Sequence, residues 1–273
     1  MHRYLNDKRT FYSPYCFKNM TQIYNFFLLN VDESIVRRCF DNMGTKWSKY
    51  DKLWVVFSIM LILFGSIYKF LFIVNSNSNV VLEVISCLLA ICGVTYVFGI
   101  AKQSKFAYFF GIANVILYAI VCYSKELYLS MSYNLFYSFP VLIYGYINWS
   151  KGTNGGNIEI KSLSRLGRII LGFGMIIAVC IFALISKNIF YGSNVLLDSI
   201  VSVSICVATF LMANKYIEQW VLFIIANFFG LVMFLVINFN NMNDVELLIM
   251  WTIYLINSFY GMFAWRKTLK KDN

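Results

Sequence analysis

The sequence of 273 residues contains few charged groups, two prolines and one histidine. Asp, Glu, Lys and Arg make up 13% of the chain and apolar residues 60%, whereas soluble domains average about 25% and about 45–50%. This composition predicts an integral membrane protein. Because His2 is the single imidazole, a His-based metal site and Ser-His or Cys-His catalysis are excluded. We therefore expect no catalytic residue, no metal and no cofactor, and a protein that is not an enzyme.

The seven cysteines also lack the spacing of a functional site. No two of them form a C-x-x-C pair, their number is odd, and five lie within apolar runs. Cysteine in such surroundings behaves as a small apolar residue. We interpret these cysteines as reduced and structural.

Long hydrophobic runs are what the sequence has in abundance. Eight of them follow a mixed N-terminal segment, and each is close to the ~20 residues that a helix needs to cross a bilayer. They cover residues 53–74, 80–100, 106–123, 127–149, 169–185, 195–213, 220–237 and 247–265. Their length and their lack of alternation exclude membrane strands. The predicted fold class is an all-α integral membrane protein with eight transmembrane helices.

The segments between and before these runs are short or mixed in composition. Residues 1–52 hold no uninterrupted apolar core, so we expect no signal peptide. This segment is predicted to be a cytoplasmic tail that either lies on anionic headgroups or is solvated. The longest joint, residues 150–168, carries Gly152, Gly155 and Gly156 and is interpreted as a flexible linker. Pro140 breaks a helical hydrogen bond within the fourth run and predicts a kink there.

The basic residues are distributed unequally between the two ends of these helices. Twenty of the 23 Lys and Arg fall on the side that carries both chain termini; Lys125 and Lys187 lie on the other side, and Lys69 lies near a helix end. Basic residues concentrate on the cytoplasmic side of membrane proteins. We therefore expect a multi-pass protein of the cell membrane with both termini in the cytoplasm. The net charge of +10 reflects this topology, so no nucleic-acid partner is expected.

An internal repeat relates two parts of the chain. The tripeptide Ile-Ala-Asn at 112–114 recurs at 225–227, an offset of 113 residues, and Tyr-Gly at 144–145 recurs at 260–261, an offset of 116. Glu83, near the start of the second run, is matched by Asp198 in the sixth. Equivalent runs lie four crossings apart, so both units have the same orientation, as in transporters with parallel repeats.

The predicted architecture is two parallel three-helix repeats joined by a linker helix, with one extra helix before them. The parts are a cytoplasmic tail (1–52), the extra helix with its outer loop (53–79), the first repeat (80–149), a cytoplasmic loop with the linker helix (150–194), the second repeat (195–268) and a C-terminal cytoplasmic tail (269–273). The substrate is expected at the repeat interface near the middle of the membrane. In this alignment Asn114 is the counterpart of Asn227, and Ala107 that of Trp220.

One helix face at the start of the seventh run combines aromatic and amide side chains. Trp220, Phe223 and Asn227 are spaced i, i+3 and i+7, which brings them within about 60° of one another on a helix. An Asn that faces lipid would leave its amide unpaired, so this face is expected to look into protein or a cavity. It can bind a flat polar ring, or else serve helix packing and an interhelical hydrogen bond.

The segments 215–220 (KYIEQW) and 144–149 (YGYINW) resemble the PnuC family of nicotinamide riboside transporters, which itself resembles the SWEET sugar transporters in a three-one-three helix arrangement. The resemblance covers roughly residues 80–268. Trp220, Phe223 and Asn227 occupy the positions of the family motif Trp-x-x-Trp-x-x-x-Asn, with Phe in place of the second Trp. The resemblance implies facilitated diffusion of nicotinamide riboside, trapping inside by a separate kinase, and a homotrimer. Another vitamin such as thiamine or riboflavin is the alternative, because relatives carry those.

Further side chains are candidates for the substrate site. A pyridinium ring over an aromatic side chain gains cation–π energy, and Asn can both donate to and accept from a carboxamide or a ribose. Each Asn can equally serve as an interhelical hydrogen bond. The predicted substrate-binding residues are Trp220, Phe223, Asn227, Asn114, Asn134, Tyr137 and Asn257.

Two acidic residues of the apolar runs have both a structural and a functional interpretation. Glu83 and Asp198 stand near helix starts, where the helix dipole stabilises a carboxylate, although they could also attract a cationic substrate or carry a proton. No segment resembles a nucleotide-binding loop, which argues against ATP-driven transport.

An intramembrane enzyme is disfavoured because no nucleophile–base pair can be assembled. A purely structural membrane protein is disfavoured by the polar residues within several runs.

Overall fold

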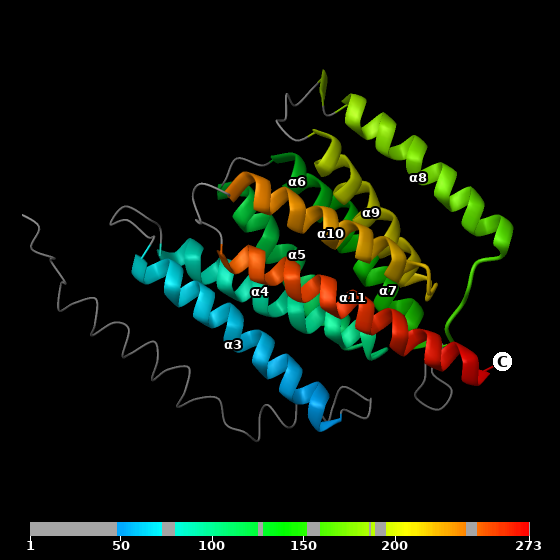
Figure 1. Cartoon of the computed structure of the whole chain (residues 1–273), viewed down its shortest axis with the longest axis horizontal. Helices are drawn as coiled ribbons and strands as arrows, with labels where there is room; N and C mark the ends of the chain where they lie inside the picture. Colours follow the sequence, from blue (N-terminus) through cyan, green and yellow to red (C-terminus); the bar gives the residue numbers. More distant parts are fainter. Residues whose placement is uncertain are drawn as a thin grey trace, which may run out of the picture. The chain divides into compact units, whose positions relative to one another are not determined.

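The computed structural model describes residues 48–72, 80–124, 128–151, 159–185, 187–188, 195–238 and 245–272, and almost all of these residues are helical (Figure 1). Most of the expected cytoplasmic tail, residues 1–47, lies outside the described residues. The elements are α3 (Lys49–Phe72), α4 (Val80–Ala101), α5 (Ala107–Ser124), α6 (Tyr128–Tyr133), the π-helical turn η1 (Asn134–Ser138), α7 (Phe139–Lys151), α8 (Arg165–Ile185), α9 (Val195–Ala213), α10 (Gln219–Asn238) and α11 (Val245–Asp272). With α6, η1 and α7 counted as one continuous run, the predicted all-α membrane fold of eight helices is confirmed.

Six of the described helices are long and apolar enough to cross a membrane, namely α3, α4, α5, α8, α9 and α11. The apolar part of α10, Gln219–Met233, is shorter. The remaining run is interrupted by η1, where the Phe139 N–H donates to the carbonyl of Asn134, five residues earlier. Pro140 follows at once, and a wide turn relieves the clash between its ring and the carbonyl four residues before it. The irregularity expected at Pro140 therefore lies in the turn that precedes it.

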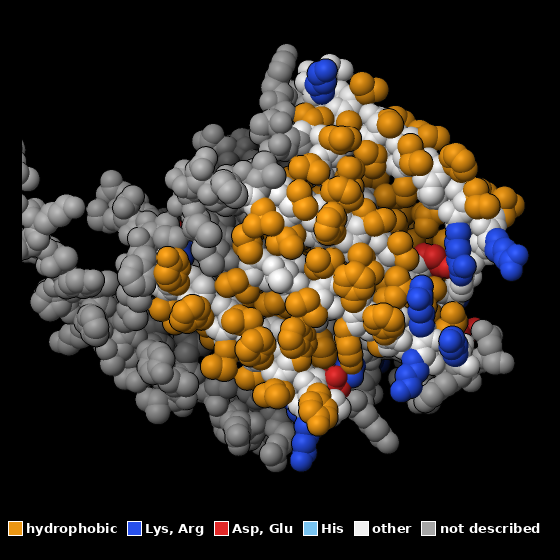
Figure 2. Space-filling model, viewed as in Figure 1, with side chains coloured by type: hydrophobic (Ala, Val, Ile, Leu, Met, Phe, Trp, Pro, Cys, Tyr) orange, Lys and Arg blue, Asp and Glu red, His pale blue; other side chains and the backbone are white. Residues whose placement is uncertain are grey.

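The outer surface of the bundle is apolar, as a surface in contact with lipid should be. Figure 2 shows hydrophobic side chains over most of the visible face, with Lys and Arg gathered near the C-terminal end of α11. Helix α8 has no buried residue, and among the described helices it packs mainly against α9. It lies at the edge of the arrangement in Figure 1.

Helix α3 packs against α4 and α11, and polar contacts hold its first turn in place. At its start, the backbone N–H of Ser48 donates to Asp51 and that of Asp51 donates to the Ser48 hydroxyl, a reciprocal cap. Asp51 also pairs with Lys102, and Tyr260 Oη donates to it at 3.1 Å. Burial opposes the charge on Lys102, but the hydrogen bond to Asp51 outweighs this and raises the pKa of Lys102. These contacts place the first residue of α3 at Lys49, four residues before the apolar run begins.

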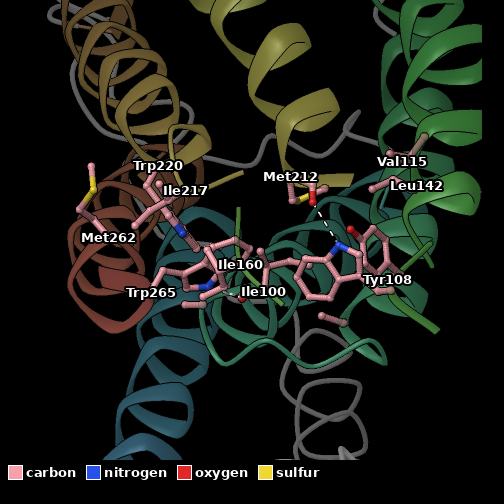
Figure 3. Close-up of a cluster of buried hydrophobic side chains, with 13 residues drawn as sticks. Ile100, Tyr108, Val115, Leu142, Ile160, Met212, Ile217, Trp220, Met262 and Trp265 are labelled. Carbon is pink, nitrogen blue, oxygen red and sulfur yellow. Dashed lines mark hydrogen bonds between the residues drawn. The ribbon is translucent and has the colours of Figure 1, made fainter. Parts of the chain in front are cut away.

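A cluster of buried aromatic and aliphatic side chains fills one end of the bundle (Figure 3). Trp149, Trp220 and Trp265 are fully buried within it. Ile160, from the segment between α7 and α8, is buried in the same cluster. That segment is held by two backbone bonds of Lys161, which donates to Lys215 O and accepts from the Ile217 N–H, both at 2.9 Å. The described part of the loop expected to be a flexible linker is therefore fixed against the start of α10.

An acidic side chain secures this loop. Glu218 Oε1 accepts from the Leu163 N–H at 3.1 Å and from Arg168 Nε at 2.9 Å, and it also accepts from the Ser162 hydroxyl at 3.2 Å. Glu218 is buried, and a buried carboxylate is stable only when it is paired and hydrogen-bonded. The segment KYIEQW thus has a structural use, because its Glu joins the linker helix α8 to α10.

The turn between α4 and α5 has the same backbone hydrogen bonds as the turn between α9 and α10, at an offset of 112 residues. Gln103 N–H donates to Ile100 O and Lys215 N–H donates to Met212 O, and five further pairs of equivalent bonds follow or precede them. Gln103 and Lys215 both have a positive φ, 61° and 67°. This offset makes Tyr108 the counterpart of Trp220, so the match of Trp220 with Ala107 is wrong by one residue at this turn.

Two tryptophans join the halves reciprocally. Trp149 Nε1 donates to Met212 O at 3.1 Å (dashed in Figure 3), and Trp265 Nε1 donates to Ile100 O at 3.2 Å. Each indole reaches from the last helix of one half to the end of the first helix of the other half. The tryptophans are 116 residues apart and their acceptors 112 apart, so the pattern agrees with a parallel repeat, whose exact boundaries remain a prediction.

Candidate functional site

A cavity of about 310 Å³ lies between the helices, lined by residues of α4, α5, the run from α6 to α7, α9, α10 and α11. On α9 its lining extends from Asp198 to Met212. Fourteen residues of helix rise by about 21 Å, so the cavity follows most of one transmembrane helix. At the Met212 end it meets the buried cluster, where Tyr96 Oη donates to Met212 Sδ at 3.1 Å. At the other end Asp198 is exposed. As far as the described residues show, the cavity is therefore closed at the Met212 end and open at the Asp198 end.

The predicted face of α10 lines the closed part of this cavity. Trp220, Phe223 and Asn227 are all lining residues, and the rings of Trp220 and Phe223 lie 6.1 Å apart, tilted by 58°. Trp220 is fully buried and also packs, because its six-membered ring lies where a Cβ on Gly261 would stand, and it meets Trp265 edge-on at 5.8 Å. Its indole N–H has no hydrogen-bond partner among the described residues. A buried donor of this kind favours an oxygen acceptor on a ligand.

Two amide side chains on the cavity wall, those of Asn227 and Asn114, each use one N–H within the protein. Asn227 Nδ2 donates to Ser258 Oγ at 2.8 Å, and Asn114 Nδ2 donates to Leu89 O at 2.8 Å. An Asn offers two donors and an acceptor with two lone pairs, so both retain capacity for a ligand. Asn134, the first residue of the π turn η1, is buried and also lines the cavity. π-Helical turns inside α-helices are frequent at functional sites.

Two of the seven predicted site residues lie elsewhere. Tyr137 is absent from the lining, and its hydroxyl donates to Cys206 O at 2.7 Å. Asn257 is fully buried and accepts from Trp54 Nε1 of α3 at 2.9 Å. Tyr137 ties the α6–α7 run to α9, and Asn257 ties α11 to α3, so the structure brings together five of the seven.

Sequence reasoning missed several aromatic lining residues. Tyr96, Trp251 and Tyr254 line the cavity, and the ring of each lies over a glycine of a neighbouring helix, namely Gly111, Gly230 and Gly93. A Cβ on Gly111 or Gly230 would overlap the ring above it, and a Cβ on Gly93 would overlap the Tyr254 hydroxyl. Pairs of a glycine on one helix and an aromatic residue on another carry no local signal, because they form only when the helices pack. A helical-wheel search for polar aromatics in the apolar runs would have suggested Tyr96 and Tyr254.

The cavity has few charges. Asp198 is the one charged residue in its lining among the described residues, and no Lys or Arg lines it there. In the same part of the chain no group of three His, Cys, Asp or Glu could hold a metal ion. The walls combine aromatic faces, amides and hydroxyls. Such a site can bind an uncharged or cationic polar ring system.

Comparison with known proteins identifies relatives of the chain. The family model "Nicotinamide mononucleotide transporter" matches residues 81–267. Proteins named "Nicotinamide riboside transporter PnuC" are similar: that of Neisseria mucosa is 28% identical over 83% of this chain and 84% of its own length, and that of Escherichia coli 29% identical over 50% and 68%.

A solved structure is similar over most of the chain. The "Crystal structure of the Vitamin B3 transporter PnuC" matches with a TM-score of 0.68 and 25% sequence identity, over 84% of this chain and 95% of that one. The resemblance inferred from the segments KYIEQW and YGYINW is thereby confirmed, and so is the prediction of a transporter rather than an enzyme. Since the family model matches more than half of its length, this multi-pass membrane protein belongs to the nicotinamide mononucleotide transporter family.

Proposed function

We propose that the chain transports nicotinamide riboside across the cell membrane by facilitated diffusion. The observation that carries this proposal is a long cavity, open at one end, whose lining holds aromatic rings and amides but no basic residue among the described ones. A separate kinase would trap the product by phosphorylation. The lack of a nucleotide-binding loop in the sequence and the names of the relatives support a carrier that needs no ATP.

The charge of the cavity favours the riboside over the mononucleotide that the family description names. A phosphate group is usually bound by Arg, Lys or a helix N-terminus. The described lining offers no Arg or Lys, and its one charge is the carboxylate of Asp198. A phosphorylated substrate would therefore be repelled, whereas a pyridinium nucleoside would not.

Five residues are assigned to the substrate in this proposal. Trp220 and Phe223 stack on the pyridinium ring, where a desolvated cation–π contact contributes about 2 kcal/mol. The amides of Asn227, Asn114 and Asn134 bond to the carboxamide and the ribose. Phe223 stands where the family motif has a second Trp, so thiamine and riboflavin remain the alternative substrates.

We also propose an orientation and an assembly. The distribution of Lys and Arg supports cytoplasmic termini, and the cavity would then open to the outside. A cysteine introduced within 75–79 should react with an impermeant reagent from outside the cell. The family resemblance and the lack of any buried residue on α8 support a homotrimer, which native mass spectrometry can test. The two repeats would span residues 80–149 and 195–268.

The proposed function is tested by binding and flux with the purified protein. Isothermal titration with nicotinamide riboside, nicotinamide mononucleotide, thiamine and riboflavin should give tight binding of the riboside alone. Proteoliposomes should exchange labelled nicotinamide riboside without a proton or sodium gradient. Preference for the mononucleotide, or accumulation driven by a gradient, would contradict the proposal.

A further inference from the structure

The open end of the cavity carries a carboxylate, that of Asp198, which lies apart from the five residues assigned to the substrate. Asp198 lies in the first turn of α9 and is exposed. Its side chain accepts a long hydrogen bond, 3.5 Å, from Ser202 Oγ on the same helix. Among the described residues it forms no ion pair, although it is the one charged residue that lines the cavity. A carboxylate without a counter-ion at the mouth of a membrane cavity exerts a field on whatever enters.

The matching acid of the first half is neutralised. Glu83 lies in the first turn of α4, as Asp198 does in α9. Its Oε2 pairs with Lys69 Nζ of α3 at 2.9 Å, and it does not line the cavity. The extra helix α3 packs beside α4 and α11. The helix beside α9 is α8, whose two basic side chains, Arg165 and Arg168, both lie in its first turn, and Arg168 is paired with Glu218. The charge of Glu83 is thus compensated by Lys69, whereas the charge of Asp198 lines the cavity.

We propose that Asp198 selects for a positively charged substrate at the mouth of the cavity. The proposal rests on the proposed function, since nicotinamide riboside carries a permanent positive charge on its pyridinium nitrogen. A carboxylate beside low-dielectric walls raises the local concentration of a cation and repels an anion such as the phosphorylated nucleotide. Asp198 then acts through charge on entry and affinity, while the aromatic rings deeper in the cavity recognise the shape of the ring.

A purely structural role for Asp198 predicts a different behaviour. As an acid in the first turn of α9 it also interacts with the helix dipole, and its loss would then lower stability without regard to substrate charge. The two roles are separated by comparing substrates of the same shape and different charge. Benzamide riboside is suited to this, because a neutral phenyl carbon replaces the pyridinium nitrogen.

The test is uptake into proteoliposomes by the full chain and three variants, with both ribosides as competing substrates. Asp198→Asn should lower kcat/KM for nicotinamide riboside by roughly five- to tenfold and leave benzamide riboside within about twofold of the parent. Asp198→Glu should restore the preference for the cation. Glu83→Gln removes the matched acid outside the cavity and should leave the ratio between the two substrates unchanged. Higher ionic strength should reduce the effect of Asp198→Asn, since salt screens an exposed charge.

Other results would overturn the inference. If Asp198→Asn slows both substrates equally, the residue is structural, and a lowered unfolding temperature would accompany that outcome. If the variant transports both as the parent does, the charge has no role. If the parent protein transports nicotinamide riboside no better than empty vesicles, the proposed function itself fails, and this inference fails with it.

Discussion

The two halves of the cavity wall share one backbone plan but place the large side chain on opposite helices. In the first half, the ring of Tyr96 on α4 lies over Gly111 of α5. At the same offset of 112 residues, the second half has Ala208 on α9 and Phe223 on α10, which pack together. One small and one large residue fill the space in both cases. The large residue is Tyr96, with a hydroxyl, in the first half and Phe223, with an apolar ring, in the second half. Two repeats with the same backbone therefore enclose a cavity with different side chains on its two sides.

The closed end follows the same rule with less variation. Tyr108 lies over Gly145 and meets Trp149 edge-on at 5.1 Å, while Trp220 lies over Gly261 and meets Trp265 at 5.8 Å. Here both halves keep the large residue on the second helix and the glycine on the third. The closed end is therefore shared structure, and the wall of the cavity is where the halves have diverged.

Substitution of the closed-end glycines should have the largest effect. Gly261→Ala should lower the free energy of unfolding by about 3 kcal/mol, since the new Cβ would stand 2.3 Å from the ring of Trp220, which is fully buried and packs against Trp265. Gly145→Ala should lower it comparably, because Tyr108 is as close. Gly172→Ala on α8 is the matched control, since nothing lies within 4 Å of it. Thermal unfolding in detergent measures all three, and equal stability would mean that the closed end is loosely packed.

Substitution of the asparagines should distinguish those that bind the substrate from the one that only joins two helices. Asn227→Ala should weaken nicotinamide riboside binding by about 1–2 kcal/mol, because it removes hydrogen-bonding groups from a buried site. Asn114→Ala should weaken it comparably if the halves contribute equally. Asn257→Ala should lower stability but leave affinity unchanged, since Asn257 bonds to Trp54. Isothermal titration decides between these cases, and a loss of affinity in the Asn257 variant would place it in the site after all.

Exchange of the aromatic residue should sharpen the difference between the two halves. Phe223→Trp restores the family motif, and Trp is the stronger cation–π partner, so affinity for nicotinamide riboside should rise by about 0.5–1 kcal/mol. The added volume lies toward the cavity that Phe223 lines. Titration together with the unfolding temperature tests this. A lowered unfolding temperature with unchanged affinity would indicate that Phe223 serves packing alone.

The turns of positive φ should give the smallest effect. Lys215→Gly should stabilise the protein by about 0.5 kcal/mol, since glycine adopts the left-handed conformation without strain but loses more backbone entropy on folding. Burial also lowers the pKa of Lys215, and the nearby Lys161 adds to this. The unfolded chain then holds this proton more tightly, so stability of the parent should rise with pH in the alkaline range below the ordinary lysine pKa of about 10.4.

The controls for this turn use the same measurement. The rise in stability should be smaller in Lys215→Gly, which has no proton to lose at this position. Gln103→Gly in the matching turn should gain less, because it also loses the hydrogen bond from Gln103 to Thr268 at 3.0 Å. Unfolding temperatures across alkaline pH test both statements, and equal pH dependence of parent and Lys215→Gly would exclude Lys215 as the source.

Much of the fold was predictable because it depends on local signals. Apolar length predicts each crossing, and the spacing of Trp220, Phe223 and Asn227 correctly indicated one face turned toward a cavity. The repeat was visible as well, but its register at the turn was not. The recurring Ile-Ala-Asn gives an offset of 113, whereas the backbone bonds of the two turns give 112. A difference of one residue rotates a helix face by about 100°, so the counterpart of Trp220 in the first repeat is Tyr108 and not Ala107.

The sequence by itself determined the membrane class, the number of helices, the distribution of charge and the aromatic and amide face of α10. Only the tertiary structure decided that Asn257 bonds to α3, that Tyr137 bonds to α9, and that Asp198 but not Glu83 faces the cavity. The physical reason is that a helical pattern states which side chains share a face. Which neighbouring helix covers that face depends on long-range packing. A glycine far away in the chain can make room for an aromatic ring, and a distant lysine can neutralise a carboxylate.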